Sequence, residues 1–130
     1  MADSDLLVID DLSKSYNGKS KALDGINVTV GRGEFVSVIG CSGAGKSTFI
    51  KLLYREEKAT SGKVEVVGQD VSKIRNNKVP YFRRNIGVVF QNFRLLPKKT
   101  VFENVAYALE VIDTPRAEIR RRVRATLELV

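Results

Sequence analysis

Apolar residues along the chain recur in the patterns of β-strands. Residues 26–30 (INVTV) alternate between apolar and polar positions, which is typical of a half-buried strand. Residues 34–40 (EFVSVIG) and 86–90 (IGVVF) are nearly continuous apolar runs with β-branched side chains, as in buried parallel strands. Further strands are predicted at the beginning of 6–16 and over 63–68.

Turn-forming residues separate these strands. Asn17-Gly18 is a strong turn signal, and the runs 31–33 and 60–62 break the chain. Pro80 can begin a helical turn, which is predicted over 80–85.

Helical spacing first occurs in the middle of the chain. A helix is predicted over 45–54, with Phe49, Ile50 and Leu53 on its buried side.

Two more helices are predicted at the end of the sequence. Thr100 caps the first, and Glu103 completes a capping box. Thr114 caps the second, with Pro115 at the first helical position. Their apolar faces comprise Val101, Val105, Leu109 and Ile112 in the first helix, and Ile119, Val123, Leu127 and Val130 in the second.

The order of these elements indicates an α/β fold. Strands come first, strand–helix units follow, and helices close the chain. This order predicts an α/β core with an antiparallel edge layer and the start of a helical appendage.

Length and composition limit the class of protein and the cellular compartment. The 130 residues suffice for one domain with a core, and no apolar run approaches the roughly 18 residues of a membrane span. One cysteine and an acidic N-terminus without a signal-peptide pattern favour a cytosolic protein.

The formal charge of +7 is concentrated in two basic clusters, 73–84 and 116–124. Such clusters can bind nucleic acid or anionic lipid. A solvated face is favoured here, because neither cluster has an accompanying base-reading motif.

The strongest chemical signal is the run 40–48 (GCSGAGKST), which satisfies the phosphate-loop pattern G-x-x-x-x-G-K-[ST]. Glycines let the backbone approach phosphates closely, and its N–H groups and the following helix N-terminus attract the anion. Lys46 is expected to reach the β- and γ-phosphates, and Ser47 to ligate Mg²⁺. The predicted nucleotide-binding residues of this loop are Gly40, Cys41, Ser42, Gly43, Ala44, Gly45, Lys46, Ser47 and Thr48.

Cys41 lies inside this loop. A helix N-terminus can lower a thiol pKa, which would make the cysteine reactive. The favoured interpretation is a small residue that fits the loop.

Tyr16 before the loop and Gln91 at the end of the run 86–90 complete an arrangement that resembles the ATP-binding subunits of ABC transporters. The resemblance implies a P-loop NTPase with a RecA-like parallel-sheet core, ATP and Mg²⁺. It implies that Tyr16 stacks on adenine, that Gln91 contacts Mg²⁺ and the attacking water, and that Lys46 and Gln91 are catalytic. It also divides the chain into a core with an antiparallel layer over 1–92 and the start of a helical subdomain over 93–130.

Residues 21–66 and 79–112 resemble the FtsE family of bacterial cell-division ABC ATPases, most of all in FRLLPKKTVFENVAYALEVI after Gln91. The resemblance implies the integral membrane partner FtsX, contacted through the segment after Gln91, and control of septal peptidoglycan hydrolysis. It further implies a homodimer of the full-length protein at the inner face of the cell membrane, with no nucleic acid bound.

Two alternatives stay open. One is the ATP-binding subunit of another ABC transporter, for lipoprotein release or small-solute transport. The other is a short nucleotide- or nucleic-acid-binding module that uses the basic clusters.

Several parts that the family uses for hydrolysis are not in this sequence. It contains no SGG signature and no histidine. Residues 6–11 (LLVIDD) mimic a Walker B strand, but such a strand follows the signature motif in ABC proteins, so an ordinary first strand is predicted. The expectation is a truncated ATPase domain that binds ATP but hydrolyses it poorly or not at all.

Overall fold

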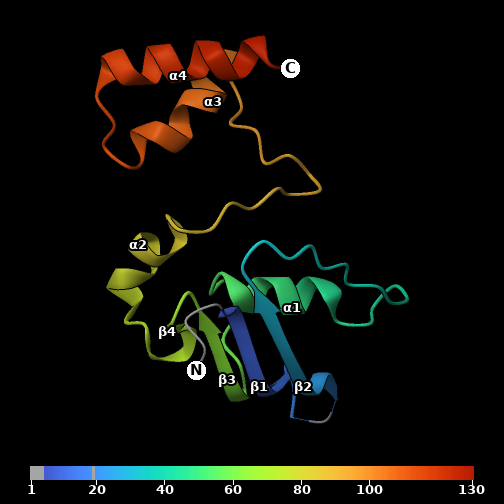
Figure 1. Ribbon diagram of the computed structural model, residues 1–130. Helices are drawn as coiled ribbons and strands as arrows, with labels where there is room; N and C mark the ends of the chain where they lie inside the picture. Colours follow the sequence, from blue (N-terminus) through green and yellow to red (C-terminus); the bar gives the residue numbers. More distant parts are fainter. Residues whose placement is uncertain (1–4, 19) are drawn as a thin grey trace. The chain divides into compact units, whose positions relative to one another are not determined.

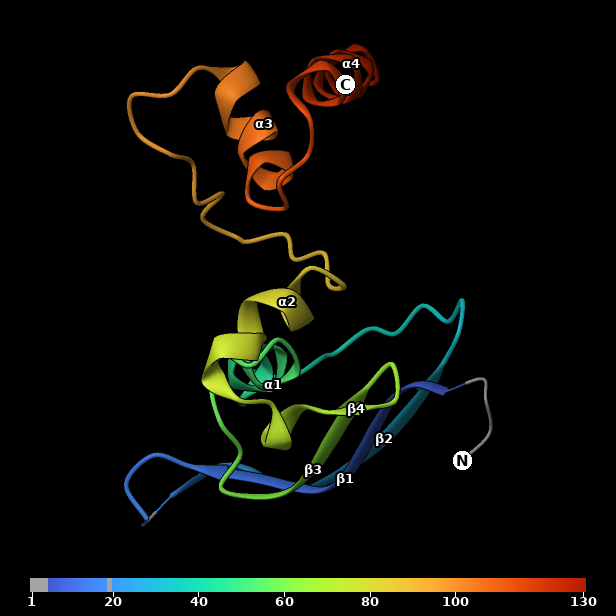
Figure 2. The same ribbon diagram turned by 90° about the vertical axis from the view of Figure 1, so that its left-hand side faces the viewer.

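The computed structural model describes residues 5–18 and 20–130, and these fall into two compact units, which are divided between Ile86 and Gly87. The first unit contains one four-stranded antiparallel sheet in the order β2-β1-β3-β4. Its strands are β1 (Asp5–Ser15), β2 (Lys21–Gly31), β3 (Ser61–Val66) and β4 (Gln69–Asp70). Helix α1 (Lys46–Leu53) lies over one face of this sheet (Figures 1 and 2).

One of the connections within the sheet agrees with the prediction and another does not. Asn17 and Gly18 lie between β1 and β2, as predicted. Val67 and Gly68, which are predicted to end a strand over 63–68, instead join β3 to β4 with φ of 50° and 72°, the positive values that a tight two-residue hairpin requires.

Strand β1 contains a bulge that shapes the core. Between the pairs Ile9↔Val28 and Leu12↔Ile26, β1 has one residue more than β2, and Asp11 adopts a φ of 47°. Strict alternation would place Ile9 and Leu12 on opposite faces, and the extra residue lets both be buried. Asp10 and Asp11 are exposed within the strand, so LLVIDD is the ordinary first strand that its sequence predicts.

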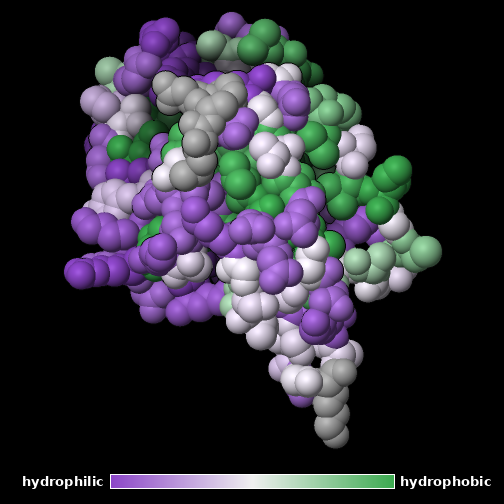
Figure 3. Space-filling view, turned by 60° about the horizontal axis from the view of Figure 1, so that its bottom comes forward, coloured by the Kyte–Doolittle hydropathy of each residue, from purple (hydrophilic) through white to green (hydrophobic). Residues whose placement is uncertain are grey.

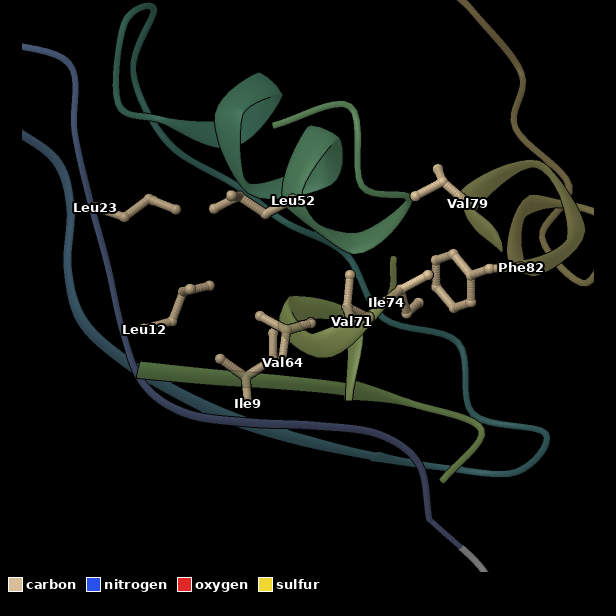
Figure 4. Close-up of a cluster of buried hydrophobic side chains, with 9 residues drawn as sticks. All are labelled: Ile9, Leu12, Leu23, Leu52, Val64, Val71, Ile74, Val79 and Phe82. Atoms are coloured by element: carbon tan, nitrogen blue, oxygen red, sulfur yellow. The ribbon is translucent and has the colours of Figure 1, made fainter. Parts of the chain in front are cut away.

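The core of the first unit joins the sheet to the following segments. After β4 the chain continues through the short 3₁₀ turns η1 (Val71–Lys73) and η2 (Asn76–Lys78) into α2 (Val79–Arg83). This helix confirms the predicted helical turn, but it begins one residue before Pro80 and ends before residue 85. Figure 4 shows the buried side chains pointing toward one another from the strands, α1, η1 and α2. They are Ile9, Leu12, Leu23, Leu52, Val64, Val71, Ile74, Val79 and Phe82.

The face of α1 differs from the prediction. Leu52 is the buried residue of this helix, Phe49 and Leu53 pack against the core from partly buried positions, and Ile50 is exposed. Ile50 instead lines an open groove beside the segment 36–39.

Two segments differ from the prediction: residues 34–40 and 86–90, which are predicted to be buried parallel strands, do not form strands in this structure. Residues 34–40 and 86–90 are neither helix nor strand, and Phe35 and Val89 are 94% and 100% exposed. A parallel strand needs hydrogen-bonded neighbours and cover on both faces, and no strand of the described residues pairs with either segment. The exposed side chains of each segment add hydrophobic surface, and Figure 3 shows hydrophobic residues, in green, at the surface.

The second unit contains α3 (Val101–Glu110) and α4 (Arg116–Glu128), which pack through Ala106, Ile119 and Val123. The capping box is confirmed: Thr100 Oγ1 accepts from the amide of Glu103 at 3.2 Å, and Glu103 Oε2 accepts from the amide of Thr100 at 2.7 Å.

Details of these two helices differ from the prediction. Val105, Leu109 and Leu127 pack against the cluster as predicted, but Val101, Ile112 and Val130 are exposed. The N-cap of α4 is Pro115, not Thr114, and has no side-chain hydrogen bond. Shifts of one residue are common at helix ends.

We predict that Leu12→Ala lowers the free energy of unfolding by about 2–5 kcal/mol, because it leaves a cavity under the bulge. Urea unfolding measures this, with Leu6→Ala as the control. Both leucines lie in β1, but Leu12 is fully buried and Leu6 is 39% exposed. Equal losses for the two variants would contradict the placement of Leu12.

The capping box predicts a pH dependence. Hydrogen bonds from the amide and hydroxyl of Thr100 lower the pKa of Glu103 from 4.5. The stabilisation is therefore complete above about pH 4.5 and is lost as pH falls through the lower folded pKa. Glu103→Gln should lower the melting temperature at pH 7, and the difference should shrink at acidic pH, as the Glu103 carboxyl becomes protonated. Circular dichroism measures this, and Glu110→Gln on the same helix should not lower it at either pH.

Candidate functional site

The phosphate loop lies between residues 34–40 and α1, at the N-terminus of that helix. Gly40 to Ala44 are exposed, and Gly43 and Gly45 adopt φ of 80° and 88°. Within the described residues, the backbone amides of Ser42, Gly43 and Gly45 donate to no acceptor. The loop therefore offers N–H donors beside a helix N-terminus, the arrangement that attracts an anion.

Lys46 is the first residue of α1 and points back across the loop. Its Nζ donates to the carbonyl oxygens of Gly40 and Cys41, both at 2.6 Å. The ammonium thus lies within the loop rather than in solvent, where it can meet a phosphate oxygen.

Position 45 requires a glycine, because the backbone there lies very close to the backbone of β2. It is the N-cap of α1, and a Cβ at this position would lie 2.4 Å from the carbonyl oxygen of Ala22 and 2.9 Å from the side chain of Leu23, both in β2. The glycine therefore lets the start of α1 contact the sheet, which fixes the position of the loop.

Tyr16 lies beside the beginning of α1. Its hydroxyl is 3.2 Å from Thr48 Oγ1, so the structure brings the aromatic ring next to the loop although the two residues are 32 positions apart in sequence. The ring is exposed, as a surface on which a planar base could stack must be.

Ser47 and Cys41 are two further loop residues whose side chains have a candidate chemical role. The side chain of Ser47 is exposed in the first turn of α1, where its hydroxyl is available to a metal ion bound with phosphates. No group of three or more His, Cys, Asp or Glu side chains suited to a metal ion occurs in the described part of the chain. Cys41 is a free, exposed cysteine.

Gln91 belongs to the second unit and is exposed in a turn after Phe90. Phe93 and Arg94 follow with φ of 56° and 46°, and the guanidinium of Arg94 lies 4.0 Å from the centroid of the Phe90 ring. The structure thus brings Tyr16 and residues 40–48 together in the first unit, while Gln91 stays a prediction. Sequence reasoning missed Lys14, whose ammonium lies over the Tyr16 ring at 4.8 Å.

No helix among the described residues is long and apolar enough to cross a membrane.

Comparisons with known proteins agree on one family. The ABC transporter family model matches residues 23–130. The cell division ATP-binding protein FtsE of Bacillus subtilis is 53% identical over 96% of this chain, and that of Mycobacterium tuberculosis is 49% identical over 96%. The methionine import ATP-binding protein MetN of Geobacillus kaustophilus is 40% identical over 96%. The chain spans 55% of the length of each of these two FtsE proteins and 37% of MetN.

Solved structures give the same result. The dimeric ATP-binding cassette MJ0796 in a post-hydrolysis state, bound to ADP and Pi, superposes with a TM-score of 0.82 at 33% identity, over 94% of this chain and 56% of that one. Cassette cbiO1 of Clostridium perfringens superposes with a TM-score of 0.82 at 28% identity, over 96% of this chain and 50% of that one. The predicted α/β cassette fold and the resemblance to FtsE proteins are thereby confirmed.

We predict that Gly45→Ala destabilises the protein more than Gly43→Ala. Both glycines have positive φ, so both variants carry similar backbone strain. Only at Gly45 does the new methyl group meet backbone and side-chain atoms, whereas it meets nothing within 4 Å at Gly43. The difference should be about 1–3 kcal/mol in urea unfolding, and equal effects would contradict the contact between Gly45 and β2.

Proposed function

The chain belongs to the ABC transporter family, and we propose that it binds Mg-ATP through residues 40–48 as the ATP-binding subunit of an ABC complex. The observation that carries the proposal is the Lys46 ammonium held at 2.6 Å from two loop carbonyls, beside unpaired loop amides. A triphosphate entering the loop would replace the carbonyls as partners of Lys46. It would also supply acceptors to the loop amides.

Each predicted site residue has a role in this proposal. Gly40, Cys41, Ser42, Gly43, Ala44, Gly45 and Thr48 form the backbone cradle around the phosphates. Lys46 neutralises phosphate charge, Ser47 ligates Mg²⁺, and Tyr16 stacks on the adenine. Gln91 joins them as an oxygen ligand of Mg²⁺ and a contact of the attacking water. The first unit then belongs to the nucleotide-binding core with its antiparallel layer, and the helices of the second unit begin the helical subdomain.

Within the family, we propose the FtsE-type cell-division role. The identity to FtsE proteins, 49–53%, exceeds the 40% to MetN of G. kaustophilus over the same share of the chain, and this favours cell division over solute import. In this role the complete protein forms a homodimer at the inner face of the cell membrane. It contacts the membrane protein FtsX through the segment after Gln91 and transmits ATP-driven motion to septal peptidoglycan hydrolysis.

Hydrolysis to ADP and phosphate belongs, in this proposal, to the complete protein. Activating water requires a positioned general base, and the carboxylate that serves in the family lies in a Walker B region that these 130 residues do not contain. The 130-residue chain should bind ATP with little or no turnover. Sustained ATP hydrolysis by the purified chain, measured as phosphate release, would overturn this part of the proposal.

Lys46→Ala should weaken Mg-ATP binding by about 10- to 100-fold, because it removes a charged hydrogen-bond donor to the phosphates. Isothermal titration calorimetry measures the affinity. Lys51→Ala is the matched control: it removes the same charge from the same helix, but Lys51 pairs with Glu56 at 3.9 Å instead of facing the loop. Unchanged affinity for Lys46→Ala, or equal losses for both, would reject the proposed role of Lys46.

A further inference from the structure

The Tyr16 side chain is held at two points. Its hydroxyl contacts Thr48 Oγ1 at 3.2 Å, and the ammonium of Lys14 lies 4.8 Å from the centroid of its ring. Tyr16 nevertheless remains 54% exposed. The ring is therefore fixed at its edge and over one face, while more than half of the residue's surface stays open to a ligand.

Lys14 is itself anchored by the segment that follows α1. Its Nζ donates to the carbonyl oxygen of Lys58 at 2.8 Å and forms an ion pair with Glu57 Oε2 at 3.1 Å. Its side chain is only 12% exposed. Most lysines extend a mobile ammonium into water, whereas this one is confined by three partners: a carboxylate, a carbonyl and an aromatic ring.

The anchoring segment is tied to the end of β1 as well. The amide of Thr60 donates to the carbonyl of Ser13 at 2.9 Å, and the amide of Ser15 donates to Thr60 Oγ1 at 3.0 Å. The loop that holds Lys14 and the end of β1, directly before Tyr16, are thus joined on both sides of Lys14. Movement of the Lys14 ammonium relative to the ring is restricted.

We propose that Lys14 is a positioning residue for base recognition, which holds the Tyr16 ring in place before the nucleotide binds. The inference rests on the proposed function, since it requires that Tyr16 stacks on the base. A cation over an aromatic ring attracts its π-face, and ordering the ring in the free protein removes an entropic cost from binding. The Lys14–Glu57 pair would then set the affinity for the base without touching the phosphates.

The test compares two ligands, Mg-ATP and inorganic tripolyphosphate, by calorimetry on the purified chain. Both ligands carry phosphates, but only ATP carries a base. Lys14→Met keeps the aliphatic stem and removes the charge, so it should weaken ATP binding about 3- to 10-fold and leave tripolyphosphate binding unchanged. Lys14→Arg should restore ATP binding, and Glu57→Gln, which loosens the anchor alone, should weaken it in the same selective way.

Lys63→Met is the matched control, because Lys63 also lies on a strand and pairs with a glutamate, Glu65, at 2.6 Å. It should change neither affinity. Equal losses for both ligands would identify Lys14 as a merely structural residue, and no loss would also overturn the proposal. If Lys14→Met does not fold, Glu57→Gln decides between these outcomes. Failure of the unmodified chain to bind either ligand would instead reject the nucleotide-binding function itself.

Discussion

The contact between α1 and the antiparallel sheet is the constraint on which the candidate site depends. Leu52 anchors the helix in the core, and Gly45 lets its first turn approach the backbone of β2, where any side chain would collide with the Ala22 carbonyl. A helix fixed at both points can project its N-terminus in only one direction. The phosphate loop and Lys46 are positioned by that direction, so the loop chemistry depends on apolar packing several residues away.

The sheet holds the second part of the site. The bulge in β1 buries both Ile9 and Leu12, and the same strand ends at Lys14 and Ser15, directly before Tyr16. Hydrogen bonds from the Thr60 segment fix that end. Tyr16 is thereby presented to Thr48 from a strand that is distant in sequence. The aromatic ring and the phosphate loop form one surface because the same core supports both.

Holding a phosphate chain and cleaving it make different chemical demands. The loop combines free amides, a helix N-terminus and a confined ammonium, which are the groups that bind an anion. Cleavage needs a base and a positioned water as well. The apolar segments 34–40 and 86–90 likewise depend on further groups, in their case on neighbouring strands. Their sequence suits buried strands, yet without paired neighbours they remain exposed.

The sequence by itself determined the features that depend on local chemistry. The phosphate loop, the Asn17-Gly18 turn, the Thr100–Glu103 capping box and the existence of each helix follow from residue types at short spacing. Tertiary structure decided the rest. It selected Leu52 instead of Ile50 as the buried residue of α1, left 34–40 and 86–90 without strand pairing, and placed Lys14 over Tyr16. The physical reason is that burial, strand pairing and a cation above a ring depend on neighbours far away in sequence, which no local pattern specifies.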